Sequence, residues 1–587
     1  MTILEVPVLI IGGGGAGLTS SIILSDLGVR HLLIERRTAL SALPKAHILN
    51  QRTTEIFRQH GLADSVTEVA GKMRDIGKAQ WKTSLAGDGP LDGLLLHEMA
   101  AFGGGALHDV YMAHSPVPPS NLPQCRLEPI LKRHAEERAP GSILFAHELL
   151  TLDERGDMVV AEIRDERNGE RLTVHAQYVI AADGGKTVGP LLGVRMEGMT
   201  GLIDIVSTHF SADLSQWWDD GTLINWFINP DSGAVFGSGA LAVMGPTWGR
   251  HSEEWNMHFA VAPGQGDFSD EDVVVPRIRE LLHTPDLDMT VHRINRWSVE
   301  SVLADRYRVG RVFLAGDAAH RHPPTTGLGL NTAIQDAHNL AWKLAAVVDG
   351  RADDGLLDSY ESERRPVGGR NVQWATFAAL NHEVLLAGIG LGPTLPPEMR
   401  AAVVHQYVED SPMGAARRAK AAEVFNTQRL EFQAHDLDLG FAYESGALIP
   451  DGSQAAPVDP LGSEYRPTTR PGHRLPHAWL ERNGVRLSTH DLTGASAHFV
   501  LLAGPEGEAW CQAAEQAARK HGISIVPVRV GGGEWTDPEG RWSELREIGP
   551  AGAVLVRPDN HVAWRSTGAA DAPTDALLRA VQAVLYG

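Results

Sequence analysis

The sequence is poor in cysteine and has no long apolar run. Its 587 residues include two cysteines, Cys125 and Cys511, and neither belongs to a Cys-x-x-Cys pair. The chain therefore has no disulfide framework and no dithiol redox centre, which predicts a reducing, cytoplasmic location. No apolar segment approaches the roughly 18–20 residues that a membrane span needs, and the first residues lack the basic leader of a signal peptide. We therefore expect no membrane association.

Positive charge is also scarce. The chain has 52 Lys and Arg against 73 Asp and Glu, a formal net charge of −21 at pH 7 with neutral histidines. That field repels nucleic acids and anionic lipids, so neither is an expected partner, and an anionic ligand would need backbone amides and a few local cations. No cluster of His, Cys, Asp and Glu has the spacing of a metal site, and we expect no metal. The length predicts three or four domains.

Glycine, by contrast, is abundant at 62 residues, and its first cluster carries a motif. Gly12–Gly17 satisfies G-x-G-x-x-G, follows the apolar run Val6–Ile11, and precedes a helical pattern over residues 18–28 and a second apolar run that ends at Glu35. In a dinucleotide site the glycines make a tight turn, admit a pyrophosphate and let the helix pack on the strand, while a carboxylate accepts the ribose hydroxyls. The alternative is a purely structural glycine turn. For Arg36 we weigh adenine contact against a solvated surface charge.

Two further motifs make the pattern specific. They are Ala182-Asp-Gly-Gly-Lys186 and Gly316-Asp-Ala-Ala-His-Arg-His-Pro-Pro-Thr-Thr-Gly-Leu-Gly-Leu-Asn331. With the glycine fingerprint, this ordered set resembles the FAD-dependent aromatic hydroxylases, which are single-component flavoprotein monooxygenases. Within that family the phenol 2-monooxygenase branch is the most similar, and the stretch Lys45–Arg52 is closest to bacterial chlorophenol 6-monooxygenases. Pro471–Pro476 and Gly552–Asp559 resemble parts of the thioredoxin-like domain that ends this branch.

The resemblance implies an α/β fold: a Rossmann-like FAD-binding domain with an inserted β-rich substrate domain and a C-terminal thioredoxin-like domain. Local patterns add strands at residues 223–228 and 235–243, and helices at residues 332–348, 507–521 and from residue 574. An alanine-rich helical stretch over about 370–435 is interrupted at Gly388–Pro393. The expected boundaries are 1–77, 109–195 and 295–375 for the discontinuous FAD-binding domain, 78–108 and 196–294 for the substrate domain, 376–445 for a helical connection, and 446–587 for the thioredoxin-like domain.

The resemblance also implies bound FAD and a transient NADPH or NADH co-substrate. Asp317, at the end of an apolar strand, would bond a ribityl hydroxyl, and the helix opening at Gly327 would direct its amides at the pyrimidine edge of the flavin. Lys45 stands where much of the family has arginine, which keeps the charge but loses bidentate geometry. The full set of expected cofactor-binding residues is Gly12, Gly14, Gly15, Ala16, Gly17, Glu35, Arg36, Lys45, Arg52, Gln124, Asp183, Asp317, Pro324, Gly327, Gly329, Leu330 and Asn331.

His47 is the expected catalytic residue, because the phenol hydroxylase branch carries an acidic or histidine residue near the substrate hydroxyl on this segment. A phenol has a reference pKa near 10, so forming phenolate at pH 7 costs about 4 kcal/mol, and a neutral imidazole can take that proton. The alternatives for His47 are flavin positioning and no chemical role. Trp226 lines the pocket or belongs to the core, and Pro324 shapes the wall between flavin and substrate.

The sequence therefore predicts an FAD monooxygenase that hydroxylates a phenolic ring, normally ortho to its hydroxyl, using NAD(P)H and O2 through a flavin C4a-hydroperoxide. The expected partners are a small aromatic substrate and O2, and the expected assembly is a homodimer. One alternative is a hydroxylase of a larger polycyclic or polyketide phenol. The alternative from another class is a non-catalytic flavin-binding or assembly module.

Overall fold

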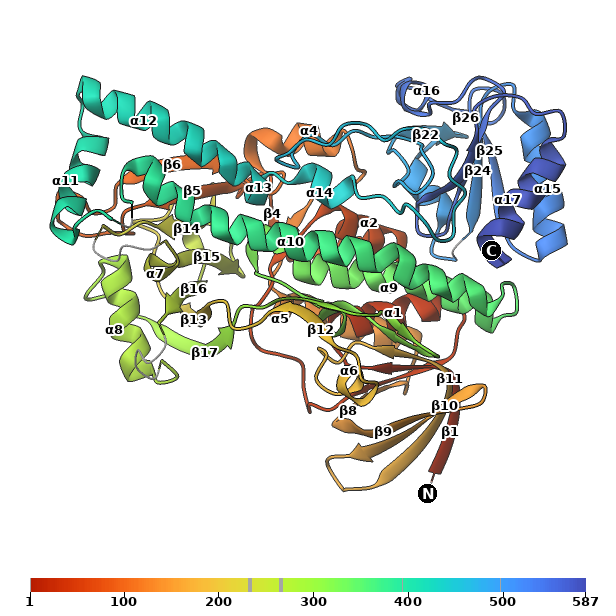
Figure 1. The fold of residues 1–587 in the computed structure, drawn as a ribbon, viewed down its shortest axis with the longest axis horizontal. Coiled ribbons are helices and arrows are strands. Elements are labelled where there is room, and N and C mark those ends of the chain that lie inside the picture. Colours follow the sequence, from red (N-terminus) through yellow and green to blue (C-terminus); the bar gives the residue numbers. More distant parts are fainter. Residues whose placement is uncertain (1, 231–234, 263–267, 393, 497, 587) are drawn as a thin grey trace.

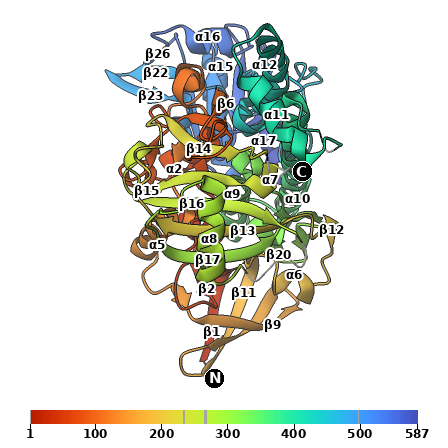
Figure 2. The ribbon, with the colours of Figure 1, turned by 90° about the vertical axis from the view of Figure 1, so that its left-hand side faces the viewer.

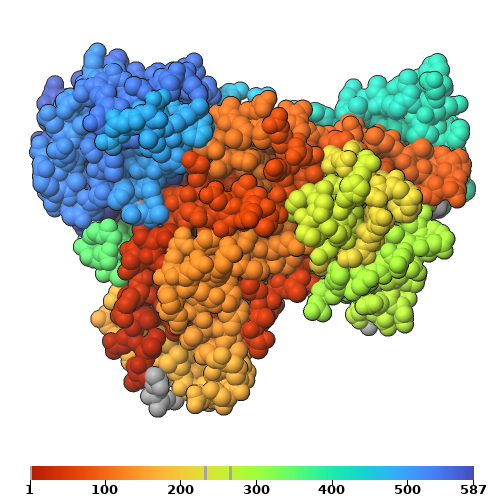
Figure 3. Space-filling view, turned by 180° about the vertical axis from the view of Figure 1, so that it is seen from behind, coloured from red at the N-terminus to blue at the C-terminus, as the bar shows by residue number. Residues whose placement is uncertain are grey.

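The computed structural model describes residues 2–230, 235–262, 268–392, 394–496 and 498–586. Figure 1 shows a mixed α/β molecule in which the long helix α10 (Asp358–Ile389) runs from an inserted sheet at one end to the C-terminal region at the other. Figure 3 shows the same two regions at opposite ends of the molecule, with N-terminal residues between them. Among the helices of the described ranges, none combines the length and apolarity needed to cross a bilayer.

The largest sheet in the described part of the chain has eight strands. Its path runs β19 (Arg308–Val309), β20 (Val312–Leu314), β11 (Arg171–Ala181), β1 (Thr2–Ile11), β2 (His31–Glu35) and β8 (Ile143–Phe145), and β9 (His147–Arg155) and β10 (Met158–Asp165) extend it beside β11. From β20 to β8 neighbouring strands are parallel. Burial on both faces explains the apolar runs Val6–Ile11 in β1 and Leu32–Ile34 in β2.

Three helices pack beside this sheet: α1 (Gly15–Asp26), α5 (Gln124–Arg138) and α9 (Leu328–Val348). They share one hydrophobic core with its strands. The predicted succession of strand, glycine turn, helix and strand over residues 6–35 is confirmed by β1, α1 and β2. The predicted helix at 332–348 is confirmed by α9, which begins four residues earlier, at Leu328.

The second sheet is built from two separate stretches of sequence. Its order is β17 (Thr290–Ser298), β13 (Asp204–Ser211), β16 (Glu254–Val261), β15 (Ala240–Gly245), β14 (Thr222–Phe227), β5 (Lys78–Lys82) and β6 (Leu95–Ala100). Side chains alternate between its faces, as strand geometry requires. The face that carries Met257 packs against α8 (Glu271–Leu282), which lies across the sheet in Figure 2. The opposite face carries Trp226 and packs against α10.

The strand predicted at 223–228 is confirmed by β14, but the strand predicted at 235–243 is wrong in its first half. Residues Val235–Ser238 form the short helix α7, and β15 begins at Ala240. Gly239 separates the two with a φ of +86°, and a Cβ there would lie 2.4 Å from the carbonyl oxygen of His258. A glycine in the left-handed region ends the helical turn and lets the chain enter the sheet.

Helices follow the part of the chain that forms the eight-stranded sheet. After α10 come α11 (Pro397–Val408), α12 (Pro412–Phe425), α13 (Arg429–Phe432) and α14 (His435–Leu439). The predicted interruption at 388–393 is confirmed, because Gly390 ends α10 with a φ of +92°; residue 393 itself lies outside the described residues. α10 begins at Asp358, so the expected boundary between residues 375 and 376 falls inside a continuous helix.

The C-terminal region contains a four-stranded sheet in the order β25 (Ile525–Arg529), β24 (Phe499–Ala503), β27 (Ala553–Val556) and β28 (Val562–Ser566). The predicted helices here are confirmed by α15 (Glu508–His521) and α17 (Pro573–Tyr586), which pack on each other. Trp342 at the end of α9 meets Phe499 edge to face, with ring centroids 5.9 Å apart. The last region therefore shares a core with α9. A smaller sheet completes it, with β23 (Val485–Ser488), β22 (Trp479–Arg482) and β26 (Trp535–Thr536).

Buried ion pairs join the C-terminal region to α2 (Gln51–Gln59). Arg474 Nε donates to Glu55 Oε2 at 2.9 Å, Arg474 Nη2 contacts the other carboxylate oxygen, and both side chains are almost completely buried. Burial alone would raise the pKa of Glu55, but the Arg474 guanidinium and the His490 ring hold it well below the usual value. The carboxylate is therefore charged at neutral pH and depends on Arg474 for compensation.

Arg474→Met tests this connection. The variant leaves Glu55 buried without its main counter-charge, so the free energy of unfolding should fall by about 3–5 kcal/mol. Urea denaturation followed by circular dichroism measures it. The matched control is Arg155→Met, which removes an exposed partner of Asp153 and should change stability by no more than about 0.5 kcal/mol. Equal losses in the two variants would contradict the structural role of the buried pair.

Candidate active site

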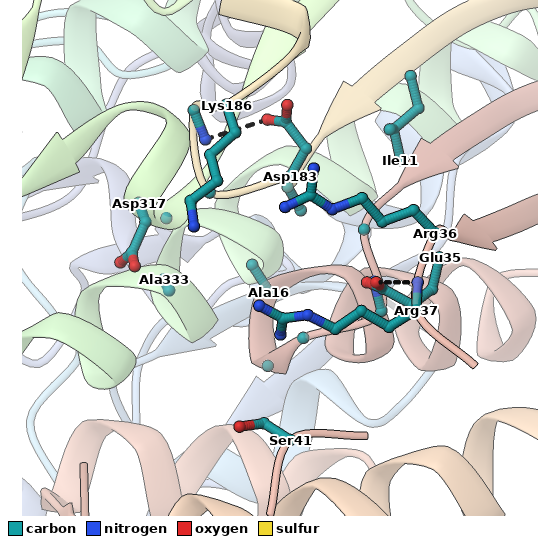
Figure 4. A pocket seen from close by; sticks show the side chains of 18 of the residues that line it. Ile11, Ala16, Glu35, Arg36, Arg37, Ser41, Asp183, Lys186, Asp317 and Ala333 are labelled. Carbon is teal, nitrogen blue, oxygen red and sulfur yellow. Dashed lines mark hydrogen bonds between the residues drawn. The ribbon is translucent and has the colours of Figure 1, made fainter. Parts of the chain in front are cut away.

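A cleft of about 640 Å³ opens at the carboxyl ends of the parallel strands. β1, β2, β11 and β20 all end at this edge, and the turns that follow them line the cleft. Figure 4 shows side chains from several of these turns directed into the same space. Ligands of open parallel sheets bind at such an edge, because the turns there can diverge around a crevice.

The glycine turn leaves no room for side chains. Gly12 has a φ of +112°, and a Cβ on it would lie 2.2 Å from the carbonyl oxygen of Ala182. A Cβ on Gly17 would lie 1.9 Å from the carbonyl oxygen of Gly12. α1 begins at Gly15 behind this turn, so its first amides and the positive end of its dipole face the cleft, as the binding of a pyrophosphate requires.

Glu35 occupies the end of β2 with its carboxylate held by backbone amides. Oε2 accepts from the Gly13 amide at 2.9 Å, and Oε1 accepts from the Arg37 amide at 2.8 Å. Two donors fix the carboxylate while each oxygen keeps a further lone pair. Glu35 can therefore accept hydroxyl groups from a ribose placed over the Gly12 turn.

The cleft collects cations in an otherwise acidic protein. Arg36, Arg37, Lys45, Lys186 and Arg321 all line it, although the chain has a net charge of −21. Figure 4 shows Arg36 and Arg37 from the β2 end on one side and Lys186 on another. Within the ranges that the structure describes, no group of His, Cys, Asp and Glu could hold a metal ion. The cleft suits an organic anion.

Asp183 supports its own turn. Oδ2 accepts from the amides of Thr187 at 2.7 Å and Val188 at 2.9 Å, and Oδ1 accepts from Gly185 at 3.1 Å. Gly184 and Gly185 adopt φ values of +74° and +70°, which gives the turn its shape. Asp183 lines the cleft, and its carboxylate holds the loop that follows β11.

The predicted residues divide into two groups by position. Those that line the cleft are Gly12, Gly14, Gly15, Ala16, Glu35, Arg36, Lys45, Gln124, Asp183, Asp317, Gly329 and Leu330. Those that lie outside its lining are Gly17, His47, Arg52, Trp226, Pro324, Gly327 and Asn331. Asp317 is exposed at the end of β20, and Figure 4 shows its carboxylate in the open space of the cleft.

Arg52 contacts the C-terminal region rather than the cleft. Its guanidinium donates to Glu55 at 3.2 Å and to the carbonyl oxygen of Asp559 at 2.6 Å, and the residue is 1% exposed. The structure thus directs this cation away from the cofactor cleft. Of Lys45 and Arg52, the two predicted cations of this segment, Lys45 lines the cleft and Arg52 does not.

Asn331 holds the first turn of α9 against the segment that contains His47. Its Oδ1 accepts from the Asn50 amide at 3.0 Å, and its Nδ2 donates to the carbonyl oxygens of Ile48 at 2.9 Å and Gly327 at 2.6 Å. Gly327, the N-cap of α9, has a φ of +67°. These bonds fix the segment after Lys45 relative to α9.

His47 follows Lys45 and Ala46, which line the cleft. It precedes β3 (Ile48–Leu49), and its Nδ1 is 2.7 Å from Oδ1 of Asn121 on β7 (Ser120–Asn121). Burial lowers the pKa of His47, so the ring is neutral at pH 7, and it also lies close enough to His258 on β16 to lower that residue's pKa. His47 therefore lies near both Lys45, which lines the cleft, and His258 of the second sheet.

Trp226 and Pro324 are placed differently. Trp226 is 7% exposed on the inner face of the second sheet, where its ring centroid lies 4.2 Å from that of His382. Its indole Nε1 is buried without a hydrogen-bond partner among the described residues. Pro324 is exposed in the loop before the turn of Thr325–Gly327.

Several residues that line the cleft were not predicted. Glu128 on α5 is 3% exposed there, and burial raises the pKa of its carboxyl, which also contacts the Gln124 amide. Phe145, His147 and Arg321 are further examples. They carry no motif of their own. Glu128 sits one turn after Gln124 on the same helix face, and that spacing is the one signal that could have indicated it.

The cleft fits FAD. The Gly12 turn admits close approach of a phosphate, Glu35 is set to receive a ribose, and the cations compensate phosphate charge. The N-terminus of α9, with Gly329 and Leu330 in the lining, supplies a second positive dipole end, next to the first turn of α1.

Comparison with known proteins agrees with this geometry. The FAD binding domain family matches residues 5–375, and the family described as aromatic-ring hydroxylase, C-terminal, matches residues 468–585. A 2,4-dichlorophenol 6-monooxygenase of Delftia acidovorans is 34% identical over 100% of this chain and 99% of its own. The flavin-dependent monooxygenase PieE, solved with FAD and substrate, is 38% identical with a TM-score of 0.92 over 99% of each chain. Aklavinone-11 hydroxylase, solved with FAD and aklavinone, is 31% identical with a TM-score of 0.79 over 100% of each.

These matches extend over the whole chain and include both the nucleotide-binding part and the C-terminal region. They agree with the arrangement of glycine turn, carboxylate and cations in the cleft. The chain belongs to the FAD-binding aromatic-ring hydroxylases and is a monooxygenase.

Proposed function

We propose that the protein hydroxylates a phenolic ring ortho to its hydroxyl, using NAD(P)H and O2. The observation that carries the proposal is the position of a half-buried histidine, His47, which follows the cleft-lining residues Lys45 and Ala46 and lies near His258 of the second sheet. FAD, once reduced by the nicotinamide, supplies the oxygen-transfer chemistry. The chain supplies binding, orientation, exclusion of water and the handling of one proton.

In the proposed site the Nε2 atom of His47 accepts the proton of the substrate hydroxyl. The resulting phenolate is richer in electrons at the ortho carbon, which is the position to be hydroxylated. Because phenolate formation at pH 7 costs about 4 kcal/mol in water, a base within hydrogen-bond reach is needed. The inserted sheet, with Trp226 on its inner face, covers the substrate and limits access of water.

We propose cofactor roles for the predicted residues on the same basis. Glu35 accepts the ribose hydroxyls, Asp317 accepts a ribityl hydroxyl, and the amides of α1 and α9 face the pyrophosphate and the pyrimidine edge. Lys45 adds positive charge beside the flavin. Arg52 is left out of this set, because its guanidinium is engaged by Glu55 and Asp559.

The domain arrangement is part of the proposal. Residues 78–108 and 196–294 form the inserted substrate domain, which agrees with the pairing of β5 and β14 in one sheet. The sheet β25-β24-β27-β28 with α15 and α17 supports a thioredoxin-like C-terminal domain. The homodimer and the cytoplasmic location remain predictions.

A larger polycyclic or polyketide phenol is the second candidate substrate. Matches to enzymes outside the chlorophenol group, such as aklavinone-11 hydroxylase, support it. The proposal is tested by the visible flavin spectrum of the purified protein, followed by NAD(P)H oxidation across simple and polycyclic phenols with identification of the products. A colourless protein that refuses added FAD contradicts the proposal. Peroxide formed without hydroxylated product from every phenol contradicts it as well.

Asp317→Ala tests the cofactor assignment. Removing a charged acceptor of one hydrogen bond should weaken FAD binding by about 10- to 100-fold, measured by recovery of flavin fluorescence on dilution. Asp353→Ala, at an exposed carboxylate that does not line the cleft, is the matched control and should bind FAD like the wild type. Unchanged affinity in Asp317→Ala would remove this residue from the FAD site.

His47→Gln tests the proton acceptor. Glutamine keeps a polar side chain but no basic nitrogen, so the hydroxylation rate should fall by about 10²- to 10⁴-fold while FAD content stays the same. Burial lowers the pKa of His47 below 6.5, so the wild-type rate should be full above that pKa and fall as the pH drops through it. The variant should lack this acidic limb. Wild-type turnover with an unchanged pH profile would exclude His47 from the mechanism.

A further inference from the structure

The hydrogen bond between His47 and Asn121 bears on both the position of the imidazole ring and the choice of the nitrogen that carries its proton. A neutral imidazole carries one proton, and the nitrogen that lacks it is the acceptor. Nδ1 of His47 lies 2.7 Å from Oδ1 of Asn121, which is an oxygen and can only accept. With this orientation of the Asn121 amide the proton is on Nδ1, which leaves Nε2 with a free lone pair.

Asn121 reaches His47 from 74 positions along the chain through backbone pairing. β7 lies antiparallel between β3 and β4 (Gly71–Lys72), with Ile48 opposite Asn121. The amide of Leu122 donates to the carbonyl oxygen of His47 at 2.7 Å. The strand pairing, the Leu122 amide and the Asn121 side chain thus hold the imidazole at a fixed place beside β7.

The asparagine side chain serves no other partner among the described residues. Asn121 is 0% exposed, its Oδ1 bonds only His47, and its Nδ2 is buried without a hydrogen bond. Buried polar atoms are normally paired, and exceptions gather at functional sites. Among the described residues this buried amide makes one hydrogen bond, and that bond goes to the proposed base. We therefore infer that the amide positions that base or a ligand beside it.

The neighbouring histidine cannot take over the role. Nδ1 of His258 is 2.7 Å from Oγ of Ser207, and its Nε2 is 3.0 Å from Nδ2 of Asn256, so both ring nitrogens are engaged. Burial, with a smaller contribution from His47, lowers the pKa of His258 to about 4. His258 is the titratable group that faces His47 from β16, and it is uncharged at neutral pH. His47 alone of this pair keeps an uncommitted nitrogen among the described residues.

We propose that Asn121 is a positioning residue that holds His47 in the Nδ1-protonated tautomer, so that Nε2 can receive the proton of the substrate hydroxyl. In this step the O–H bond of the phenol breaks, its electron pair stays on the phenolate oxygen, and the new N–H bond forms at Nε2. The resulting imidazolium keeps its Nδ1–H bond to Asn121. The catalytic role of this tautomer rests on the proposed function. The presence of the tautomer in the protein does not depend on that function.

Two substitutions separate tautomer control from simple packing. Asn121→Asp keeps the acceptor but adds a charge that favours imidazolium, so the acidic limb of the hydroxylation profile should move up by about 1–3 pH units, with activity recovered at higher pH. Asn121→Leu removes the acceptor, so the rate should fall about 10-fold or more at every pH. Asn381→Leu, at another buried asparagine that bonds Thr427, is the control and should keep the wild-type profile.

Nitrogen-15 NMR of histidine-labelled holoenzyme gives a readout that does not depend on activity. The His47 signals are identified by their loss in His47→Gln. We expect a protonated Nδ1 and an unprotonated Nε2 in the wild type, and a changed tautomer in Asn121→Leu at unchanged FAD content. An unprotonated Nδ1 in the wild type would overturn the proposal. An acidic limb that stays in place in Asn121→Asp while Asn121→Leu keeps wild-type turnover would overturn it too. If no phenol is hydroxylated, the proposed function fails, but the NMR comparison still decides the tautomer.

Discussion

The close approach of backbone segments around Gly12 is the constraint on which the rest of the molecule depends. The turn after β1 lies against the end of β11 at Ala182 and against α1 at Gly17, with no space for a Cβ at either glycine. This contact sets the angle at which α1 leaves the sheet and therefore the direction of its free amides. It also brings Glu35, from the adjacent strand end, over the same turn. The phosphate-binding geometry thus follows from backbone packing rather than from charged side chains, which suits a protein with a net charge of −21.

The segment from Lys45 to Gln59 connects the cleft with the proposed substrate site and with the C-terminal region. Asn331 ties its first part to α9, and the pairing of β3 with β7 places His47 beside Asn121. The following helix, α2, is fixed from the other side by Arg474 and by the contact between Arg52 and Asp559. The C-terminal region therefore contributes no group to the cleft lining among the described residues, yet it braces the helix that follows the proposed base.

Local patterns predicted the parts of the fold and site that depend on local sequence. The run from Val6 to Glu35 specified strand, turn, helix and carboxylate because each is set by neighbours in the chain. What could not be predicted depends on distant contacts. Arg52 was expected at the flavin but bonds a carbonyl 507 positions away, and Glu128 enters the cleft only because α5 packs beside α1. The strand expected from Val235 failed at Gly239, whose backbone conformation is fixed by contact with β16. Periodicity gives no information about such contacts.

We propose that this cleft and the neighbouring histidine together perform an FAD-dependent monooxygenation of a phenol. Mass spectrometry of the product formed under oxygen-18 gas reveals the source of the added oxygen. We expect each hydroxylated product to gain one labelled oxygen atom, with none from labelled water, and NAD(P)H to be consumed in equal amount. An added oxygen that derives from water, or labelled peroxide with no label in the aromatic product, would contradict it.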